Sequence, residues 1–199
     1  ISDEIYDKLT YDNASHVCVA SLSDAIKRHT ILIHGVSKTY AMTGWRIGYL
    51  LGPEHVVGAI SRMQSHTTSN PTSIAQYAAI EALQMDQSIL NDMRQIFDRR
   101  RQLMIQQLSA IPGISINQPN GAFYAFPKID ALFGKTTTTG KKITNSLEFC
   151  EALLEDAQVA CVPGIGFGSE GYMRLSYATS DQNIESGLSR IKDWVSTLS

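Results

Sequence analysis

The chain has 199 residues, 43% of them hydrophobic and 18% charged, so it can bury a sizeable core as one large or two small globular domains. Its net charge of −2 and pI near 6.2 provide no basic surface of the kind that binds nucleic acid or an anionic membrane. No apolar run approaches the ~20 residues that cross a bilayer and no signal peptide opens the chain, so we expect a cytoplasmic protein.

The chain begins with residues 1–6 (ISDEIY), which we interpret as the end of a buried strand that passes into a loop. Ligand-binding groups gather where the strands of open α/β sheets end, which makes Asp3 and Tyr6 candidate site residues. Taken alone, the same residues also fit a turn or cap aspartate and an amphipathic surface tyrosine.

A short helix over 22–28 leads to a strand over 30–36, which is rich in β-branched and apolar residues. That strand delivers Ser37 and Lys38 to its end. A turn rich in Thr and Gly follows, and residues 46–51 read as the next strand.

Lys38 and Arg46 bring two chemistries to this strand-turn-strand segment. A lysine amine forms an imine with an aldehyde, and the planar guanidinium suits bidentate contact with phosphate. An aldehyde that carries a phosphate is pyridoxal phosphate. A bare pair at this spacing also fits two loop residues without function, so the surrounding motifs have to decide.

Three helices are predicted next: residues 53–63, a helix that ends near Gln84, and a long amphipathic helix over 86–110. The segment Ser69-Asn70-Pro71 is predicted to cap the second of them. The apolar stripe of that second helix consists of Ile74, Ala75, Ala78, Ala79 and Leu83.

The second half alternates short strands and helices. Pro112-Gly113 ends the long helix, and a turn at 119–121 separates two strands. The elements predicted after the long helix are strands at 115–117 and 122–126, a helix at 146–157, strands at 159–162 and 172–178, and a helix from a cap at Asp181 to about Leu198.

Three features imitate binding motifs without their spacing. The run Arg99-Arg100-Arg101 lies among acidic neighbours, so we interpret it as a solvated helix face. Residues 134–142 (GKTTTTGKK) lack the spacing of a phosphate loop and read as a mobile surface loop. The three cysteines, Cys18, Cys150 and Cys161, show no Cys-x-x-Cys spacing, so we expect no metal site and no disulfide framework.

Arg174 lies within the apolar pattern of the strand over 172–178. An unpaired guanidinium is costly to bury, so a partner carboxylate is expected, and no acidic residue close in sequence supplies one. The alternative is an edge arginine whose charged head reaches solvent.

Four stretches resemble motifs of the class I aminotransferases and occur in the family's order: SDEIY from Ser2, SKTYAMTGWRIGY from Ser37, GAFYAFP from Gly121 and YMRLSYA from Tyr172. The likeness is closest to the bacterial-type aspartate and aromatic aminotransferase branch, and it covers essentially the whole chain. It implies an α/β fold that comprises the C-terminal part of the large domain, with a mainly parallel sheet, and a small α/β C-terminal domain. The implied domains are residues 1–95, which bind the cofactor, and residues 96–199.

The resemblance implies a role for each candidate residue around pyridoxal phosphate. Asp3 pairs with the pyridinium nitrogen and Tyr6 bonds the ring oxygen. Lys38 forms the Schiff base and moves the substrate proton, while Arg46 and Ser37 bind the phosphate.

Arg174 is implied to hold the substrate α-carboxylate. The implied reaction is transamination between an amino acid, either aspartate or a related acidic or aromatic one, and a 2-oxo acid such as 2-oxoglutarate, carried out by a homodimer. Two alternatives on the same scaffold are a cofactor-binding sensor domain of a transcription regulator and a pyridoxal-phosphate lyase.

The sequence departs from the family pattern at a few positions. Gly35 stands where many members have a phosphate-binding serine, so Ser37 or a backbone amide is expected to substitute. Position 65 is a serine, near where animal-type aspartate enzymes carry an arginine that reads the distal carboxylate. Asn70 is either a cross-subunit contact or a helix cap. Because family members are considerably longer, we expect this chain to be a C-terminal half and a poor catalyst alone.

Overall fold

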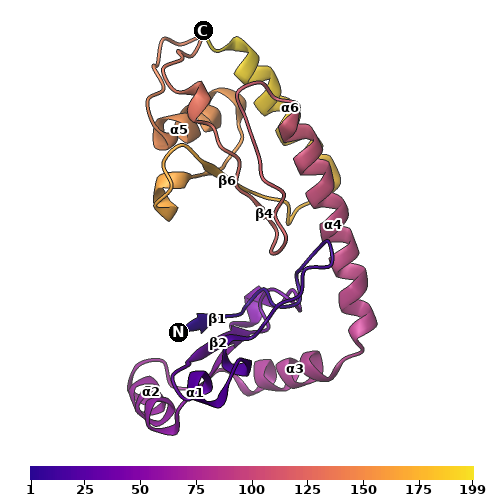
Figure 1. Ribbon diagram of the computed structural model, residues 1–199, viewed down its shortest axis with the longest axis vertical. Coiled ribbons are helices and arrows are strands. Elements are labelled where there is room, and N and C mark those ends of the chain that lie inside the picture. The colour runs from indigo at the N-terminus through magenta and orange to yellow at the C-terminus, as the bar shows by residue number, and fades with distance from the viewer. The chain divides into compact units, whose positions relative to one another are not determined.

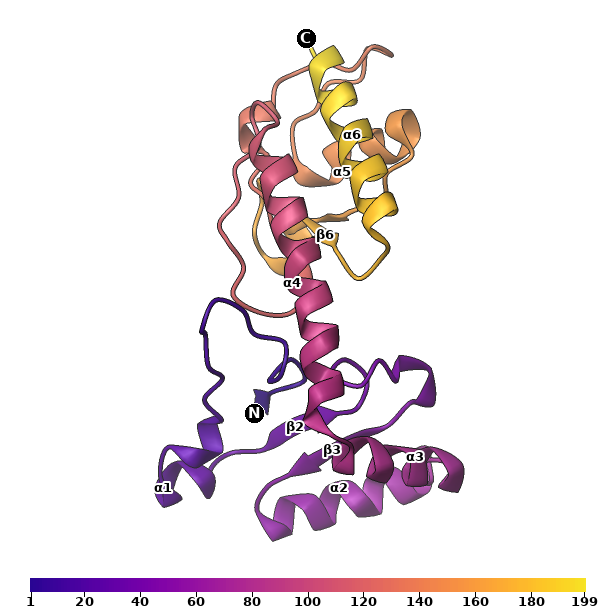
Figure 2. The ribbon, with the colours of Figure 1, turned by 90° about the vertical axis from the view of Figure 1, so that its right-hand side faces the viewer.

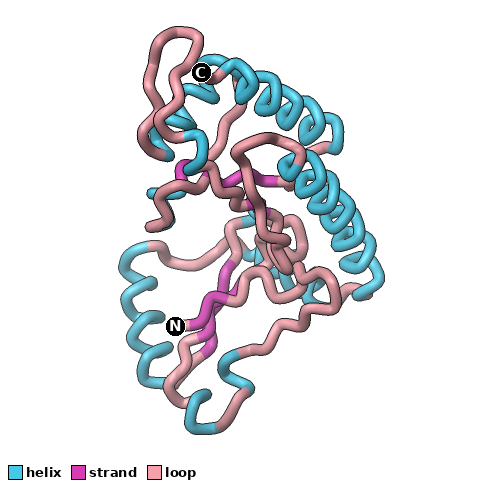
Figure 3. Tube along the Cα trace, turned by 45° about the horizontal axis from the view of Figure 1, so that its top comes forward, coloured by secondary structure: helices cyan, strands magenta, loops and turns pink.

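The computed structural model describes residues 1–199, apart from the side chain of Gln87, as two units that divide within one long helix (Figure 1). Unit 1 is Ile1–Arg94 and unit 2 is Gln95–Ser199. Their assignment as a cofactor-binding domain and a small C-terminal domain stays a prediction. Strands make up a small part of the chain, and helices and loops make up most of it (Figure 3).

Unit 1 contains a three-stranded sheet of β1 (Ser2–Asp3), β2 (Leu32–Gly35) and β3 (Gly48–Leu51), in that order. β1 and β2 are parallel, whereas β2 and β3 are antiparallel. The mainly parallel sheet that we expect is therefore represented in this chain by one parallel pair. The predicted α/β class is confirmed by this arrangement of strands and helices.

The helices of unit 1 follow the predicted order. They are the 3-10 turns η1 (Val19–Ser21) and η2 (Thr43–Trp45), α1 (Asp24–Lys27), α2 (Glu54–Thr67), α3 (Ser73–Gln84) and the first part of α4 (Gln87–Ser109). Helices α2 and α3 lie on the same side of the sheet (Figures 1 and 2). Ala75 and Ala79 of α3 form a small core with Val36 and Ile47, which fixes α3 beside the strand ends.

Two predictions for these helices are wrong. Helix α2 continues to Thr67, beyond its predicted end at Met63. The N-cap of α3 is Thr72 and not the segment 69–71, and its hydroxyl makes no capping hydrogen bond. In the predicted apolar stripe, Ile74 is 75% exposed, because the core of unit 1 reaches only the side of α3 that carries the two buried alanines.

Unit 2 packs helices around a second small sheet, whose order is β4-β6-β5 with antiparallel neighbours. Its elements are β4 (Tyr124–Ala125), η3 (Asp130–Leu132), α5 (Ser146–Ala157), β5 (Val162–Pro163), η4 (Gly164–Phe167), β6 (Met173–Ser176), α6 (Asp181–Thr197) and the remainder of α4. Residues Met104, Phe149, Leu153, Met173 and Ile191 belong to its continuous apolar core. Burial of these side chains is the main stabilising term.

The strand predictions in unit 2 need two corrections. The predicted strand at 115–117 is reduced to a single bridge between Ser115 and Lys128, so the turn at 119–121 does not join a paired hairpin. The strand predicted at 159–162 forms instead at Val162–Pro163. Both differences arise because the buried strand β6 offers the pairing edges, and β4 and β5 pair with it and not with their sequence neighbours.

The arginine run on α4 is also not uniformly solvated. Arg101 is fully buried, bonding Asp98 at 2.7–2.8 Å and the carbonyl oxygen of Pro119 at 2.8 Å. Arg99 and Arg100 pair with Asp181 at the start of α6, at 2.8 and 3.0 Å. The cluster is structural as expected, but its buried member was missed because its acceptor on Pro119 lies in a distant loop.

The cysteines are free thiols. Cys150 is buried in the core of unit 2, whereas Cys18 and Cys161 are partly exposed. No helix among the described residues combines the length and apolar character needed to cross a membrane.

Candidate functional site

The strand register of unit 1 brings five of the six predicted site residues to one edge of its sheet. Because β1 and β2 run in the same direction, both end at this edge, and the antiparallel β3 begins there. Asp3 is the last residue of β1, and Tyr6 follows this strand. Ser37 and Lys38 follow β2, and Arg46 precedes β3. The ends of parallel strands are where α/β sheets bind ligands.

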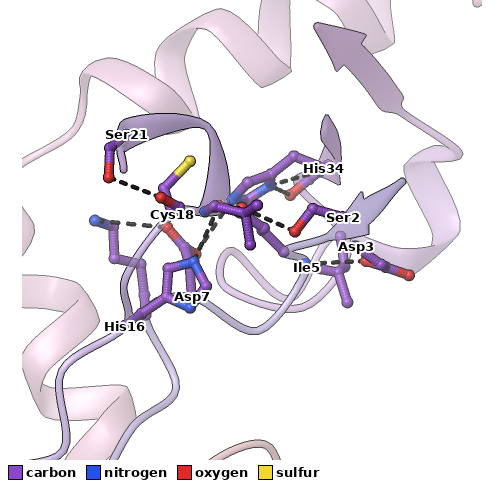
Figure 4. A network of polar contacts seen from close by, with 12 residues as sticks. Ser2, Asp3, Ile5, Asp7, His16, Cys18, Ser21 and His34 are labelled. Atoms are coloured by element: carbon purple, nitrogen blue, oxygen red, sulfur yellow. Dashed lines mark hydrogen bonds and ion pairs between the residues drawn. The ribbon is translucent and has the colours of Figure 1, made fainter. Parts of the chain in front are cut away.

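Asp3 is the last residue of β1, and Tyr6 lies in the turn that follows. The Asp3 carboxylate accepts a hydrogen bond from the backbone N–H of Ile5 at 3.1 Å, and the Asp3 residue is exposed. The Tyr6 carbonyl accepts the N–H of Leu9 at 2.9 Å, which closes the turn. Asp3 points away from the group formed by Ser2, His16 and Cys18 (Figure 4). Alternation along β1 accounts for this, since Ser2 and Asp3 face opposite sides of the sheet.

Ser37 and Lys38 lie half-buried in the turn that leaves β2, and the Lys38 carbonyl accepts the N–H of Ala41 at 3.2 Å. Gly35, which replaces the family's serine, pairs directly with Gly48. A Cβ at position 35 would lie 2.8 Å from the carbonyl oxygen of Ile47. The close approach of β2 and β3 therefore excludes a serine here, and the nearest hydroxyl-bearing candidate is Ser37.

Arg46 has a left-handed backbone conformation (φ 56°, ψ 44°), which ends η2 and turns the chain into β3. Its guanidinium is exposed and donates one hydrogen bond, from Nη1 to the carbonyl oxygen of Thr43 at 2.8 Å. It lines a pocket of about 580 Å³ together with Ser69 and Asn70. In the part of the chain that the structure describes, no carboxylate pairs with this cation, so its remaining donors are open to an anion.

A second polar cluster beside this edge was missed by sequence reasoning. His34 Nε2 lies 3.2 Å from Asp7 Oδ1 (Figure 4). The His34 ring stacks on that of Tyr49, with the ring centroids 5.4 Å apart and an interplanar angle of 3°. Burial, and then the charge of Asp7, raises the pKa of Tyr40. Burial, followed by Tyr40 and Asp7, raises the pKa of Tyr49. The signal that could have revealed the cluster is the register pairing of positions 34 and 49, which a sequence alone does not fix.

Arg174 lies on β6 in unit 2. Its neighbours Met173 and Leu175 point into the core, so the strand alternation directs Arg174 to the opposite face. Among the described residues, none forms an ion pair or hydrogen bond with its guanidinium. The described residues of unit 2 therefore include no carboxylate partner for Arg174, and the cation contacts two aromatic rings, Tyr124 at 4.5 Å and Phe167 at 4.4 Å.

Residues 1–191 match the family model described as "Aminotransferase class I and II". The chain belongs to this family. It is 48% identical to the aspartate aminotransferases of Geobacillus stearothermophilus, over 96% of this chain and 47% of the relative, and of Bacillus subtilis (strain 168), over 98% and 48%. The crystal structure of the aspartate aminotransferase from Rhizobium meliloti superimposes with a TM-score of 0.95 at 43% identity, covering 98% of this chain and 49% of that one.

This aminotransferase chain therefore spans about half the length of the curated relatives that it matches. The sequence motifs from Ser2, Ser37, Gly121 and Tyr172 all lie inside the matched residues. The resemblance inferred from those motifs is confirmed. The roles of the individual site residues stay predictions.

Proposed function

We propose that this chain belongs to a pyridoxal-phosphate-dependent aminotransferase. The enzyme exchanges the amino group of aspartate, or of a related acidic or aromatic amino acid, with a 2-oxo acid such as 2-oxoglutarate. The observation that carries the proposal is the strand register of unit 1, because it gathers an amine, a guanidinium and a carboxylate at one sheet edge. The names of the relatives favour transamination over the sensor and lyase alternatives.

The chemistry of these side chains fits the cofactor. Lys38 offers an amine for the aldehyde, and Arg46 offers N–H donors for the phosphate, assisted by Ser37. The Asp3 carboxylate is an acceptor for the protonated ring nitrogen, and the Tyr6 phenol is a donor for the ring oxygen. Pyridoxal phosphate, when bound, withdraws electrons from the substrate α-carbon and so supplies the electron sink of the reaction.

The residues of the chain then hold the reactants and move one proton. Lys38 Nζ would accept the proton from the substrate α-carbon and return it on the other side of the exchange. The Asp3 carboxylate would accept a hydrogen bond from the ring nitrogen, which would favour the protonated ring. Arg174 binds the substrate α-carboxylate through two parallel N–H donors. We further propose a homodimer that works in the cytoplasm.

The test uses the completed protein, which we define as this chain joined to, or coexpressed with, a segment equivalent to the half of its relatives that it does not match. Lys38→Ala is expected to abolish the borohydride-stable attachment of the cofactor, read as the mass of the peptide that contains position 38. Arg46→Ala should keep the attachment and weaken cofactor affinity by about tenfold or more, because a charge-assisted bidentate contact is lost.

Lys27→Ala is the matched control, because Lys27 is exposed on α1. Helix α1 precedes β2 in the chain, whereas Lys38 follows the end of β2. It should leave both attachment and affinity unchanged. A cofactor adduct that survives in Lys38→Ala would show that the assignment of this lysine is wrong.

A further inference from the structure

Arg174 contacts two aromatic rings, and sequence reasoning did not predict either contact. Its guanidinium carbon lies 4.5 Å from the centroid of the Tyr124 ring and 4.4 Å from that of the Phe167 ring. We propose that Tyr124 and Phe167 are positioning residues, which hold the guanidinium so that its N–H edge stays open for a substrate carboxylate. The proposal rests on the proposed function, in which Arg174 binds that carboxylate.

The sheet of unit 2 sets up the first ring. Tyr124 of β4 pairs directly with Ser176 of β6, and Arg174 lies two residues before Ser176 on the same strand. Tyr124 is therefore the diagonal neighbour of Arg174 on one face of the sheet. On the other side of β6, Val162 of β5 pairs with Arg174. Diagonal neighbours in an antiparallel pair lie within reach of long and aromatic side chains. The opposite face carries the buried residues Ala125 and Leu175, so this diagonal contact lies on the face away from the core.

The second ring comes from η4, whose position is fixed by a close backbone approach. The N–H of Gly164 donates to the carbonyl oxygen of Tyr172 at 2.8 Å. A Cβ at Gly164 would lie 2.2 Å from the carbonyl oxygen of Ser169, so only glycine allows this approach. The Phe167 ring then meets Phe126 edge-on at 5.9 Å and 87°, and Phe126 stacks on Tyr172 at 5.1 Å.

Aromatic rings stabilise a cation without using its hydrogen-bond donors. The guanidinium is planar, and its five N–H groups point outward in that plane, whereas a ring covers only a face. An acidic residue in the same place would neutralise Arg174 and occupy those donors. The two rings therefore provide the stabilisation that we expected from a carboxylate, and the edge of the guanidinium remains available to a carboxylate from outside the chain.

The rings also restrict the side chain. An arginine has several rotatable bonds, and ordering them on binding costs conformational entropy. A guanidinium that already contacts the rings of Tyr124 and Phe167 loses less freedom when the carboxylate arrives. The expected effect of removing one ring is therefore weaker carboxylate binding.

The geometry is tested first without catalysis, by NMR of the arginine side chains in the 199-residue chain. Ring currents should move the guanidinium protons of Arg174 upfield of those of Arg190, an exposed arginine on α6. Arg174→Lys assigns the signal by its loss. Phe167→Leu should move the Arg174 signal back downfield, and Ile165→Leu, the matched control on the same 3-10 turn, should not. An Arg174 signal without an upfield shift would overturn the proposal.

The functional consequence is measured in the completed protein as KM and kcat for L-aspartate and for β-alanine, an amine that lacks the α-carboxylate. Phe167→Leu and Tyr124→Leu should each raise KM for aspartate about threefold to thirtyfold, the range that cation–π contacts support, with a smaller change in kcat. Tyr124→Phe keeps the ring and should stay close to wild type. The rate with β-alanine should not change.

The outcomes separate the two proposals. Equal losses with aspartate and β-alanine would mean a general structural defect and would overturn the positioning role. Inactivity of the unsubstituted completed protein would overturn the proposed function, and the NMR result would then decide on the geometry alone.

Discussion

The Glu4 side chain connects β1 with the loop that leads to η1, beside the candidate site. Its side chain is buried at 5% exposure and accepts hydrogen bonds from Ser2 Oγ at 3.1 Å and from the N–H of Val19 at 3.2 Å. His16 Nε2 lies 3.0 Å from Oε2 of Glu4, and His16 is labelled in Figure 4. Burial tends to raise the pKa of Glu4, but the hydrogen bonds, led by that of His16, outweigh it and lower the pKa below its ordinary value.

A lowered pKa means that the folded state prefers the charged form of Glu4. This stabilisation is complete above the ordinary glutamate pKa of about 4.3 and is lost as the pH falls through the folded value. Glu4→Gln should therefore lower the free energy of unfolding by about 1–3 kcal/mol at pH 7. The difference from wild type should shrink towards pH 3. Urea unfolding of the chain at both pH values measures it.

Glu185→Gln is the control for this prediction, because Glu185 is exposed on α6. It should change stability little at either pH. An undiminished effect of Glu4→Gln at pH 3 would contradict a charge-dependent role.

The sequence predicted the placement of single residues best where placement depends on local order. Lys38 follows a run rich in β-branched and apolar residues and Arg46 precedes a mainly apolar one, so both could be assigned to strand ends, and strands form in both segments. The rings around Arg174 and the acceptor of Arg101 could not be predicted. Their partners lie many residues away, and only the tertiary fold brings them into contact.

At the scale of elements, the next prediction concerns the C-terminal end of helix α5. Its C-cap residue is Gln158, whose backbone is left-handed (φ 56°, ψ 40°) and whose N–H donates to the carbonyl oxygens of Leu153 and Leu154. A side chain is strained in this conformation and glycine is not. Gln158→Gly should raise the free energy of unfolding by about 0.5–1 kcal/mol. The urea midpoint should rise without a change in slope.

Gln158→Ala separates backbone strain from side-chain contacts. Alanine keeps the Cβ and should bring no gain. Equal stabilisation by alanine and glycine would mean that the left-handed conformation is not the cause.

Elements were predicted well where their signals are local, and less well where a partner decides. Helix α5 has its predicted bounds because Asn145 caps its start, accepting the N–H of Glu148 at 2.9 Å. Strands were predicted at 115–117 and 159–162, but pairing with β6 determines which residues enter the sheet. Pairing is a tertiary property, and strand propensity does not determine it.

At the scale of the molecule, the fold class followed from alternating strands and helices together with family motifs. The sequence pattern does not show which apolar side chains of a helix stay exposed in the folded chain. In α3, Ile74, Tyr77 and Ile80 follow one another at a spacing of three and are 75%, 73% and 46% exposed. Ala75 and Ala79 lie on another side of the helix and are buried. A contiguous exposed apolar stripe of this kind marks an interaction surface.

We expect this stripe to cause self-association of the 199-residue chain at micromolar concentrations. Because burial of apolar area drives association, the triple variant Ile74→Ser, Tyr77→Ser, Ile80→Ser should shift sedimentation towards the monomer. Its helix content by circular dichroism should stay close to that of the parent, since the buried alanines are unchanged. In the completed protein, α3 should gain protection from hydrogen exchange if another segment or subunit covers it.

The control variant replaces Leu22, Met63 and Leu154 with serine. These residues are 58%, 70% and 53% exposed, so a similar amount of apolar surface is removed, but from separate elements. Single exposed apolar residues are normal on soluble proteins, whereas a contiguous stripe offers one surface to a partner. The scattered variant should therefore leave sedimentation nearly unchanged. A chain that sediments as a monomer with α3 intact, or an equal response to both triple variants, would show that the stripe is not an interaction surface.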